Sequence, residues 1–546
     1  MKRWGVAGLL LLVITAALFL RCGDLAGRPL HNDEAINAFK VRKLWATGEF
    51  RYDPHEYHGP VLYYLTLPVA AVAKGVGGAV ELDERTMRSV PLVVGIALIL
   101  LLALAADGLG WGVVAVGGLF TAVSPVMVYY SRYYIHELPL VFFTAWTLLS
   151  AWRYSRRPGP GWAAAVGAGV ALMYATKETF VFALASAVGA WGVAQWISLR
   201  ELALTAGRSA NLPSRGGGAA AWTAGLVHPW WEAVRRHGWS AGLAGAVVFV
   251  LLFTSFFTNA AGPLDALRTY WIWGERAGGA SPHIHPWAFY FQRLAWFRWR
   301  SGPLWTEAAV LGWALIGVWG VAGRGWLGGK ARFLGLFVAV YSVLLAAVYA
   351  LIPYKTPWCA LGFYHGLLVL AGYGVGFLWH RFRATLARAL LGCAVLVSAG
   401  HLAVQSTRAT GEYAADFRNP WVYGHTSADI WNLLEQLEAV AAVHPEGRRM
   451  AVQIMAPESG YWPLPWYLRT WERVGWWDKV PEEPLAPLVV TAARLDARLE
   501  EKTGKAWRMV GMFELRPRFF VEVNVEAGLW QVFLAARARE NASAGN

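Results

Sequence analysis

The stretch His31-Asn32-Asp33-Glu34-Ala35-Ile36-Asn37 follows directly after the first apolar segment of the chain. Ionised side chains are costly near hydrocarbon, so two adjacent acids at the edge of such a segment indicate a functional site. The alternative is that Asp33 and Glu34 cap a short helix, because Asp is a favoured N-cap residue. This stretch alone leaves both interpretations open, and the rest of the chain has to decide between them.

The composition is typical of a polytopic membrane protein. The chain has 546 residues, of which 56% are hydrophobic and only 15% are charged, whereas soluble domains are about 25% charged. The net charge is +14, but no nucleic-acid-binding module accompanies it, so we expect no nucleic acid partner. The three cysteines, Cys22, Cys359 and Cys393, have neither disulfide nor metal-ligand spacing.

The apolar residues form about eleven blocks that approach the roughly 20 residues needed to cross a bilayer. The blocks lie near residues 5–20, 89–106, 111–128, 138–153, 162–176, 179–197, 239–258, 304–323, 333–352, 358–379 and 388–405. The first block lacks a convincing cleavage site and is predicted to be an uncleaved span. With the N-terminus inside, the Arg- and Lys-rich loops fall on the cytoplasmic side, as the positive-inside rule requires. We expect a protein integral to the cytoplasmic (inner) membrane.

The apolar block from Val61 to Gly78 is predicted to lie on the outer surface as an interfacial helix. Counting it as a span would place the basic loops outside, and Pro68 and Lys74 interrupt it. Residues 21–87 then form a long external loop, residues 259–303 form a second one, and Ala206 to Gly218 form a flexible cytoplasmic loop.

The domain organisation follows from a change of character near Gln405. Residues 1–405 are predicted to form a transmembrane domain, and residues 406–546 a small extracytoplasmic domain of the α/β or α+β class. Strands are predicted at Met450–Met455, Leu488–Thr491, Phe519–Val525 and Leu529–Leu534, a helix at Ala493–Glu501, and a frayed end from about Ala536.

In this topology the polar motifs collect at the outer face. They are Asp33-Glu34, Tyr57-His58-Gly59-Pro60, Ser131-Arg132-Tyr133-Tyr134-Ile135-His136-Glu137, Thr176-Lys177-Glu178-Thr179, His283/His285 and Tyr354-Lys355-Thr356-Pro357-Trp358. Ionisable groups gathered at one face suggest a polar cavity that opens outward between helices. Carboxylates can act as bases or bind a divalent cation, and lysine and arginine can hold a phosphate, so the inventory fits group transfer. No phosphate-binding glycine loop is present, which argues against a nucleotide cofactor.

Each of these motifs also has a purely structural interpretation. Lys177-Glu178 is either a local ion pair or a phosphate-binding lysine oriented by an acid, while Arg132 and Glu137 could simply snorkel and cap. His283 and His285 would lie on one side of an extended segment, either as a metal pair or as part of an ordinary loop. Lys355 lies between Pro353 and Pro357, which restrict the backbone around it, and His58 is followed by Gly59-Pro60.

The order of motifs resembles the C-type membrane glycosyltransferases, which include protein O-mannosyltransferases and the aminoarabinose transferase of lipid A. The resemblance covers nearly the whole chain, and it looks closest to a subfamily described as flippase-activity-associated, named from archaeal N-glycosylation proteins. The motifs that carry it are His31-Asn32-Asp33-Glu34-Ala35, Tyr52-Asp53-Pro54…Tyr57-His58-Gly59-Pro60, Pro353-Tyr354-Lys355-Thr356-Pro357-Trp358, Asn419-Pro420-Trp421-Val422-Tyr423-Gly424-His425-Thr426 and Tyr461-Trp462-Pro463-Leu464-Pro465-Trp466-Tyr467-Leu468-Arg469.

The resemblance implies transfer of a sugar from a polyprenyl-phosphate donor to a glycan, lipid or protein acceptor at the outer face, among membrane lipids. It makes Asp33 the general base or the group that orients the acceptor, with Glu34 in support and Glu137 as the second acidic motif. Substrate or phosphate binding would fall to Arg132, Lys177, Glu178, Tyr354, Lys355 and Trp358.

This chain departs from the aminoarabinose transferase pattern at two places. Ile36 stands where a phosphate-binding arginine is expected, and the Tyr57-His58 region lacks a metal-ligand glutamate and a phosphate lysine. The resemblance therefore leaves a divalent metal ion as a candidate cofactor, with His58, His283 and His285 as candidate ligands. The alternative function is a flippase-associated, transporter or scaffold component of glycan assembly. A transporter or flippase partner would need charged residues at mid-membrane depth and on both faces, and we find few acids within the spans and no inverted repeat.

Overall fold

The computed structural model describes residues 3–55, 58–77, 81–209, 230–276, 283–323, 329–482 and 484–544. Two compact units make up the chain. The membrane unit comprises Met1–Leu25, Lys43–Tyr413 and Arg418–Trp421, and the C-terminal unit comprises Ala26–Arg42, Ala414–Phe417 and Val422–Asn546. Tyr57 and residues 210–218 of the predicted flexible loop lie outside the described residues.

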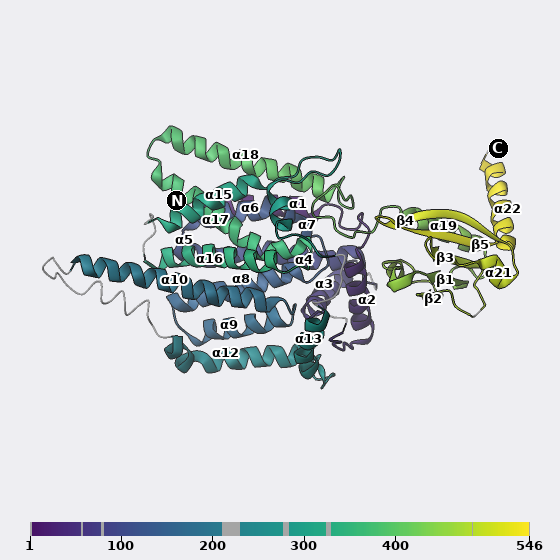
Figure 1. Ribbon diagram of the computed structural model, residues 1–546, viewed down its shortest axis with the longest axis horizontal. Helices are drawn as coiled ribbons and strands as arrows, with labels where there is room; N and C mark the ends of the chain where they lie inside the picture. The colour runs from purple at the N-terminus through teal and green to yellow at the C-terminus, as the bar shows by residue number, and fades with distance from the viewer. Residues whose placement is uncertain are drawn as a thin grey trace. The chain divides into compact units, whose positions relative to one another are not determined.

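The membrane unit is a bundle of long helices that run side by side (Figure 1). Its helices are α1 (Arg3–Cys22), α3 (Val61–Gly77), α4 (Glu84–Leu101), α5 (Ala106–Leu109), α6 (Trp111–Val123), α7 (Pro125–Tyr130), α8 (Glu137–Arg156), α9 (Pro160–Tyr174), α10 (Phe180–Ser209), α12 (Trp230–Phe253), α13 (Gly262–Arg276), α14 (Phe289–Ala295), α15 (Ala308–Ala322), α16 (Gly329–Leu351), α17 (Ala360–Arg381) and α18 (Thr385–Thr410). Helix α2 (Asn32–Thr47) begins in the C-terminal unit and ends in the membrane unit.

Six helical segments among the described residues are long and apolar enough to cross a membrane. They are Glu84–Leu109, Phe180–Glu201, Val234–Phe253, Ala331–Leu351, Pro357–Arg381 and Thr385–Thr410, and shorter apolar helices accompany them. The predicted polytopic α-helical fold is therefore confirmed. One predicted span, residues 111–128, is divided into α6 and α7 at Ser124, because the residue before a proline is disfavoured in a helix.

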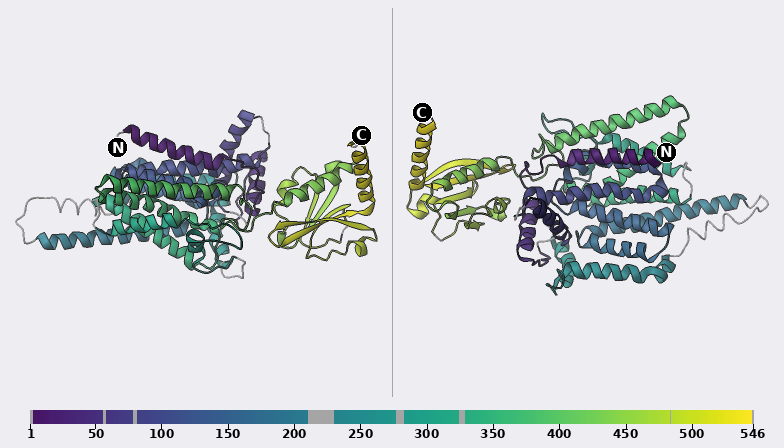
Figure 2. Two further views of the ribbon diagram at one scale, coloured as in Figure 1. Left: turned by 90° about the horizontal axis from the view of Figure 1, so that it is seen from above. Right: turned by 180° about the vertical axis from the view of Figure 1, so that it is seen from behind.

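Both predicted external loops contain helices. Residues 21–87 hold α2 and α3, and residues 259–303 hold α13 and α14. Helix α3 is inclined to the long helices of the bundle in Figure 2. Its placement at a membrane surface stays a prediction.

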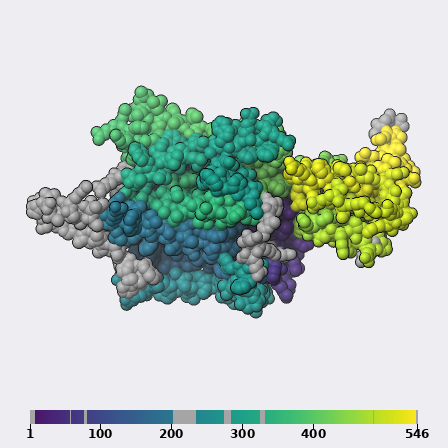
Figure 3. All heavy atoms as spheres, in the orientation of Figure 1, coloured from purple at the N-terminus to yellow at the C-terminus, as the bar shows by residue number. Residues whose placement is uncertain are grey.

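Glycines allow the bundle helices to pack closely. A Cβ on Gly317 of α15 would lie 2.1 Å from the carbonyl oxygen of Leu370 on α17, and one on Gly374 would lie 2.1 Å from that of Trp313. Small residues at such crossings let two helix backbones meet, as is common in membrane proteins. On the membrane unit, the face drawn in Figure 3 is covered largely by residues from the middle of the chain, coloured teal and green.

The C-terminal unit contains a five-stranded mixed sheet with the order β2-β1-β3-β5-β4. Strand β1 pairs in parallel with β2 and β3, while β5 pairs antiparallel with β3 and β4. The strands are β1 (Ala451–Met455), β2 (Arg473–Trp477), β3 (Leu488–Ala492), β4 (Trp507–Arg516) and β5 (Phe519–Glu526), and the helices are α19 (Ile430–Val443), α20 (Leu464–Tyr467), α21 (Leu499–Thr503) and α22 (Ala527–Ala544).

The sheet buries apolar side chains on both faces. Leu488 and Val490 of β3 contact the core that α19 covers, whereas Val489 faces a smaller core with Leu499 and Trp507. This alternation follows from the two-residue repeat of a strand.

Three local predictions for this unit were wrong or incomplete. Residues Leu529–Leu534 belong to helix α22 rather than to a strand, and the predicted frayed end is helical to Ala544. The run of aromatic and aliphatic residues there suggested a strand, but the alanine-rich continuation favours a helix. The predicted helix at Ala493–Glu501 is only the short α21, and Arg498 before it has a positive φ of 43°.

Candidate active site

The start of helix α2 is held by a capping box in which His31 takes the place of the usual Ser or Thr. The carbonyl oxygen of His31 accepts the N–H of Ala35 at 2.9 Å. The ring Nδ1 of His31 accepts the N–H of Asp33 at 3.1 Å. In return, the Glu34 carboxylate accepts the N–H of His31 at 3.0 Å. These bonds satisfy backbone donors that the first turn of a helix leaves without partners.

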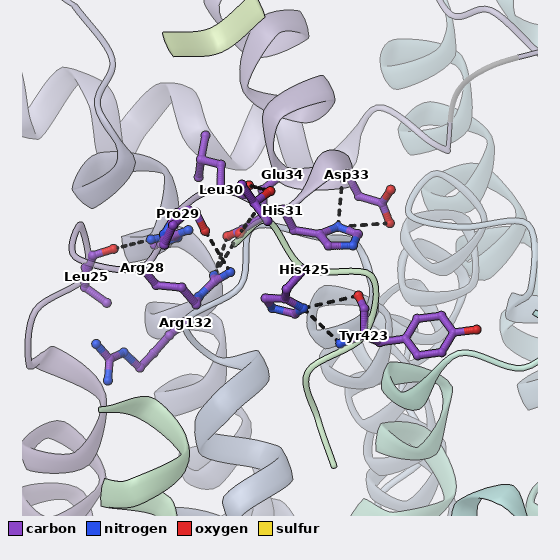
Figure 4. Close-up of polar contacts among 12 residues, drawn as sticks. Leu25, Arg28, Pro29, Leu30, His31, Asp33, Glu34, Arg132, Tyr423 and His425 are labelled. Atoms are coloured by element: carbon purple, nitrogen blue, oxygen red, sulfur yellow. Dashed lines mark hydrogen bonds and ion pairs between the residues drawn. The ribbon is translucent and has the colours of Figure 1, made fainter. Parts of the chain in front are cut away.

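The two acids of this stretch therefore have different environments. The Glu34 side chain is fully buried and pairs with the Arg28 guanidinium at 2.8 Å. The Asp33 side chain keeps 49% of its surface exposed, and its carboxylate lies 3.9 Å from the His31 ring nitrogen, which is beyond hydrogen-bond distance. In Figure 4 the Asp33 carboxylate points away from the Arg28–Glu34 pair. His31 and Glu34 provide the cap, so Asp33 is not needed for it.

A second histidine packs against His31. The rings of His31 and His425 lie 5.2 Å apart between centroids, and both residues are buried. The Nδ1 of His425 accepts the N–H of Tyr423 at 2.9 Å. The same nitrogen of His425 also lies 3.2 Å from the carbonyl oxygen of Tyr423. In His31 the Nδ1 acts as an acceptor, which requires that nitrogen to be unprotonated. Burial lowers the pKa of both rings, and this keeps them neutral.

In the membrane unit, the segment that precedes α3 packs against the turn between α9 and α10. The N–H of Gly59 donates to the carbonyl oxygen of Thr176 at 3.2 Å. A Cβ on Gly59 would lie 2.0 Å from the carbonyl oxygen of Ala175, so a glycine is required for this approach. The contact brings His58 next to Glu178.

Ionisable side chains from three segments meet at this turn. The Nδ1 of His58 lies 2.9 Å from the Glu178 carboxylate. The Lys177 amine donates to the carboxylate of Glu137, the first residue of α8. The rings of His58 and His136 lie 5.1 Å apart. The structure thus joins three predicted site segments, which contain His58, Glu137 and Lys177-Glu178.

The charges at this turn compensate one another despite burial. Burial lowers the pKa of Lys177, but nearby groups, the Glu137 carboxylate above all, together raise it by a larger amount. The pKa therefore lies above its ordinary value. Burial raises the pKa of Glu178, but the His58 ring outweighs this effect and the pKa falls below its ordinary value. Both groups are ionised at neutral pH, and Glu137 already balances the positive charge of Lys177.

A small cavity opens beside the Lys177–Glu137 pair, between α8, α10, α16 and the start of α17. Thr179, Tyr341 and Trp358 line it together with apolar side chains, and the space open to water is about 20 Å³, which is enough for one ordered water. Within the described part of the chain, the buried Tyr341 hydroxyl makes no hydrogen bond. The predicted residue Trp358 is therefore next to the Lys177–Glu137 pair.

Two other predicted motifs pair with each other through their backbones. The N–H of Lys355 donates to the carbonyl oxygen of His283 at 2.8 Å. The His283 ring packs edge-on against Tyr354, with centroids 4.9 Å apart, and the His285 ring stacks on Phe289 at 4.3 Å. The two histidines thus contact different aromatic rings.

The remaining predicted phosphate-binding cations donate to backbone carbonyls. The buried Lys355 amine donates to the carbonyl oxygen of Ile352, and burial lowers the pKa of this lysine. Arg132 donates to the carbonyl oxygens of Gly23 and Asp24 at 2.9 and 2.5 Å. Both residues lie on connections between helices.

No group of three or more His, Cys, Asp or Glu side chains that could hold a metal occurs in the part of the chain that the structure describes. The nearest arrangement to a predicted metal site is the His58–Glu178 pair, which offers two side-chain ligands. Catalytic zinc sites use three protein ligands. The divalent metal ion stays a prediction.

Comparison with solved structures identifies the architecture. ArnT from Cupriavidus metallidurans in the apo state matches with a TM-score of 0.63 and 15% identity, over 96% of this chain and 99% of that one. The chain has the C-type glycosyltransferase fold. The Pmt1–Pmt2 protein O-mannosyltransferase complex of S. cerevisiae shares the C-type fold, with a TM-score of 0.53 and 10% identity over 80% of this chain and 92% of that one. No family model and no curated protein sequence matches the chain.

The comparison confirms the predicted fold, while membership of the superfamily and of the subfamily stays a prediction. Two groups of side chains contain candidate site residues: one at the start of α2 (the first cluster) and one at the turn between α9 and α10 (the second cluster). Several residues of these clusters had no role in the sequence interpretation. They are His31 and His425 in the C-terminal unit, and His136 and Tyr341 in the membrane unit. His31, His136 and His425 stand inside quoted motifs, so their positions pointed to them, but their bonds depend on partners distant in sequence.

Proposed function

We propose that this protein is a membrane glycosyltransferase that moves a sugar from a polyprenyl-phosphate donor to an acceptor at the outer face of the membrane. The observation that carries the proposal is the C-type fold over 96% of the chain. Similar structures include ArnT bound to undecaprenyl phosphate and the Pmt1–Pmt2 complex bound to the sugar donor. A lipid-linked sugar is therefore the donor class that we expect.

In the proposed reaction Asp33 is the general base. The acceptor hydroxyl oxygen attacks the anomeric carbon from the side opposite the phosphate, and its proton passes to the Asp33 carboxylate. The bond between the anomeric carbon and the phosphate oxygen breaks, and the configuration inverts. The polyprenyl phosphate leaves with the bonding electron pair. The 49% exposure of the Asp33 side chain supports this role, because a base has to reach its substrate.

The leaving phosphate gains negative charge, and cations that face it would stabilise the transition state. We assign this role to Lys177, with Arg132 and Lys355 as further candidates. Because Lys177 is paired with Glu137, phosphate binding requires the lysine to exchange that carboxylate for the phosphate. A divalent ion bound by His58 would supply further positive charge.

The proposed location follows from the charge of the loops. The chain would lie in the inner membrane with its N-terminus inside, and Asp33 and the C-terminal unit would lie on the extracytoplasmic side.

Purified protein incubated with a panel of radiolabelled undecaprenyl-phosphate sugars tests the proposal through hydrolysis or transfer of the label. We expect Asp33→Asn to abolish turnover, while Asp496→Asn retains it. Asp496 is a matched control because it is an exposed acid in the same unit. Full turnover by the Asp33→Asn variant would reject Asp33 as the base.

A further inference from the structure

The C-terminal unit holds the backbone of the segment that carries Asp33. Leu30, three residues before Asp33, is fully buried. The Tyr467 hydroxyl accepts the N–H of Leu30 at 2.8 Å, and the Thr426 hydroxyl donates to the carbonyl oxygen of Leu30 at 2.6 Å. Two side chains distant in sequence thus satisfy both backbone groups of Leu30, which leaves this residue little conformational freedom.

Further contacts continue the attachment along α2. His425, next to Thr426, packs against the His31 ring. Gly424 has a φ of +58°, and a Cβ there would lie 3.6 Å from Nε2 of His31, so a glycine suits this turn. One face of α2 continues this contact through Phe39, whose ring packs edge-on against Trp462 at 6.3 Å.

We propose that the C-terminal unit positions Asp33 for chemistry, with Tyr467 and Thr426 as positioning residues. The inference rests on the proposed function, in which Asp33 is the base. A capping box fixes where a helix starts but does not fix where that start lies within the C-terminal unit. The bonds to Leu30 do so, because they tie the backbone just before the cap to the C-terminal unit.

The rate of catalysis depends on how accurately the reacting group is positioned. A displacement of about 1 Å in a reacting group can lower a rate by about 100-fold. Helix α2 has 16 residues, and isolated helices of about this length are marginal in water. An exposed carboxylate on such a helix needs tertiary contacts nearby to hold it in place. A unit that served only to dock a partner would not need to hold residues 26–42.

The test uses the full-length protein and two measurements. Tyr467→Phe and Thr426→Val each remove one hydroxyl that bonds to Leu30. Tyr461→Phe is the matched control, because the Tyr461 hydroxyl donates to the Ser459 hydroxyl at 3.4 Å rather than bonding to Leu30. Thr426→Ser keeps a hydroxyl and is the conservative rescue.

Hydrogen exchange reports the attachment without any need for activity. We expect faster exchange of the amides of residues 30–35 in Tyr467→Phe and Thr426→Val, and exchange as in the wild type in Tyr461→Phe and Thr426→Ser. With the undecaprenyl-phosphate sugar that the wild type turns over, we expect kcat to fall about 10- to 100-fold in the first two variants while KM changes less than about twofold.

Two outcomes would overturn the inference. Unchanged exchange would show that these hydroxyls do not hold the segment, and faster exchange with unchanged kcat would show that the attachment does not serve catalysis. Asp33→Asn, measured in parallel, separates this failure from failure of the proposed function. If Asp33→Asn is inactive but Tyr467→Phe and Thr426→Val are fully active, the base assignment stands and the positioning role falls.

Discussion

At the start of α2, one carboxylate is buried in an ion pair and its neighbour is half exposed. At the turn between α9 and α10, both members of the Lys177–Glu137 pair are buried. In the first cluster Glu34 performs the structural task, which leaves Asp33 free of the cap. In the second cluster the lysine proposed to bind phosphate is already neutralised.

The difference separates two kinds of candidate site residue. Asp33 needs no rearrangement before it can accept a proton, whereas Lys177 has to give up Glu137 before it can bind a phosphate. A buried pair is costly to break but is weak evidence of stability in itself. The comparison can therefore be tested by removing one charge at a time from each cluster.

The largest effect is expected from Lys177→Met, which leaves Glu137 buried without its cation. We expect a loss of about 3–5 kcal/mol in stability, seen as a lower thermal unfolding midpoint of the purified protein. The double variant Lys177→Met/Glu137→Leu should recover most of this loss, because no charge is left unpaired. Arg268→Met, which breaks the more exposed pair with Asp265, is the control. A single variant as stable as the wild type would contradict the pairing.

The next largest effect is expected from acid, which should lower the folding stability of the first cluster. Because burial lowers the pKa of His31 and His425 below 6.5, the unfolded chain binds protons that the folded chain rejects. Stability is then complete above pH 6.5 and falls below it by up to about 1.4 kcal/mol per histidine for each pH unit. The charged groups that act on this pair are Asp33, Glu34, Arg28 and Arg516.

Hydrogen exchange of residues 30–35 as a function of pH measures this effect. Exchange corrected for its intrinsic pH dependence should accelerate below pH 6.5. The partly exposed His444 in the same unit supplies the control, since His444→Gln should leave the profile unchanged. A flat profile from pH 7.5 to 5.5 would argue against neutral, buried rings.

A smaller effect is expected for Glu34→Gln, which weakens the capping box and removes the partner of Arg28. We expect a loss of about 1 kcal/mol, the usual value for a helix cap, and faster exchange in the first turn of α2. Thermal unfolding and exchange both report it. Glu49 is an exposed acid just after the same helix, and Glu49→Gln should change neither measurement. If Glu34→Gln also changed neither, Glu34 would have no capping role.

The smallest stability effect is expected for Asp33→Asn. Because this side chain is half exposed and outside the cap, we expect a change within about 0.5 kcal/mol, together with loss of turnover. Unfolding midpoints of the inactive variant and the wild type should therefore coincide. A strongly destabilised Asp33→Asn would mean that the two acids of this stretch share the structural task.

Much of the fold was predictable because hydrophobic blocks and basic loops depend only on local composition. The sheet of the C-terminal unit was harder, and β2 and β4 were not predicted. Both strands mix polar, aromatic and apolar residues, and partner strands decide which of them are buried. Helix α22 was missed because its first turns contain the aromatic and aliphatic residues that strands favour.

The sequence by itself determined that this is a polytopic membrane protein, that its ionisable motifs lie in the connections between apolar blocks, and that the Asp33-Glu34 stretch is a candidate site. Only the tertiary structure decided that Glu34 belongs to the helix cap and that Asp33 stays exposed. The same pair can cap a helix or stay exposed, and the outcome depends on Arg28, the His31 ring and residues near position 425 arriving beside it. The bonds of Leu30 to Tyr467 and Thr426 join residues hundreds of positions apart, and no local pattern encodes them.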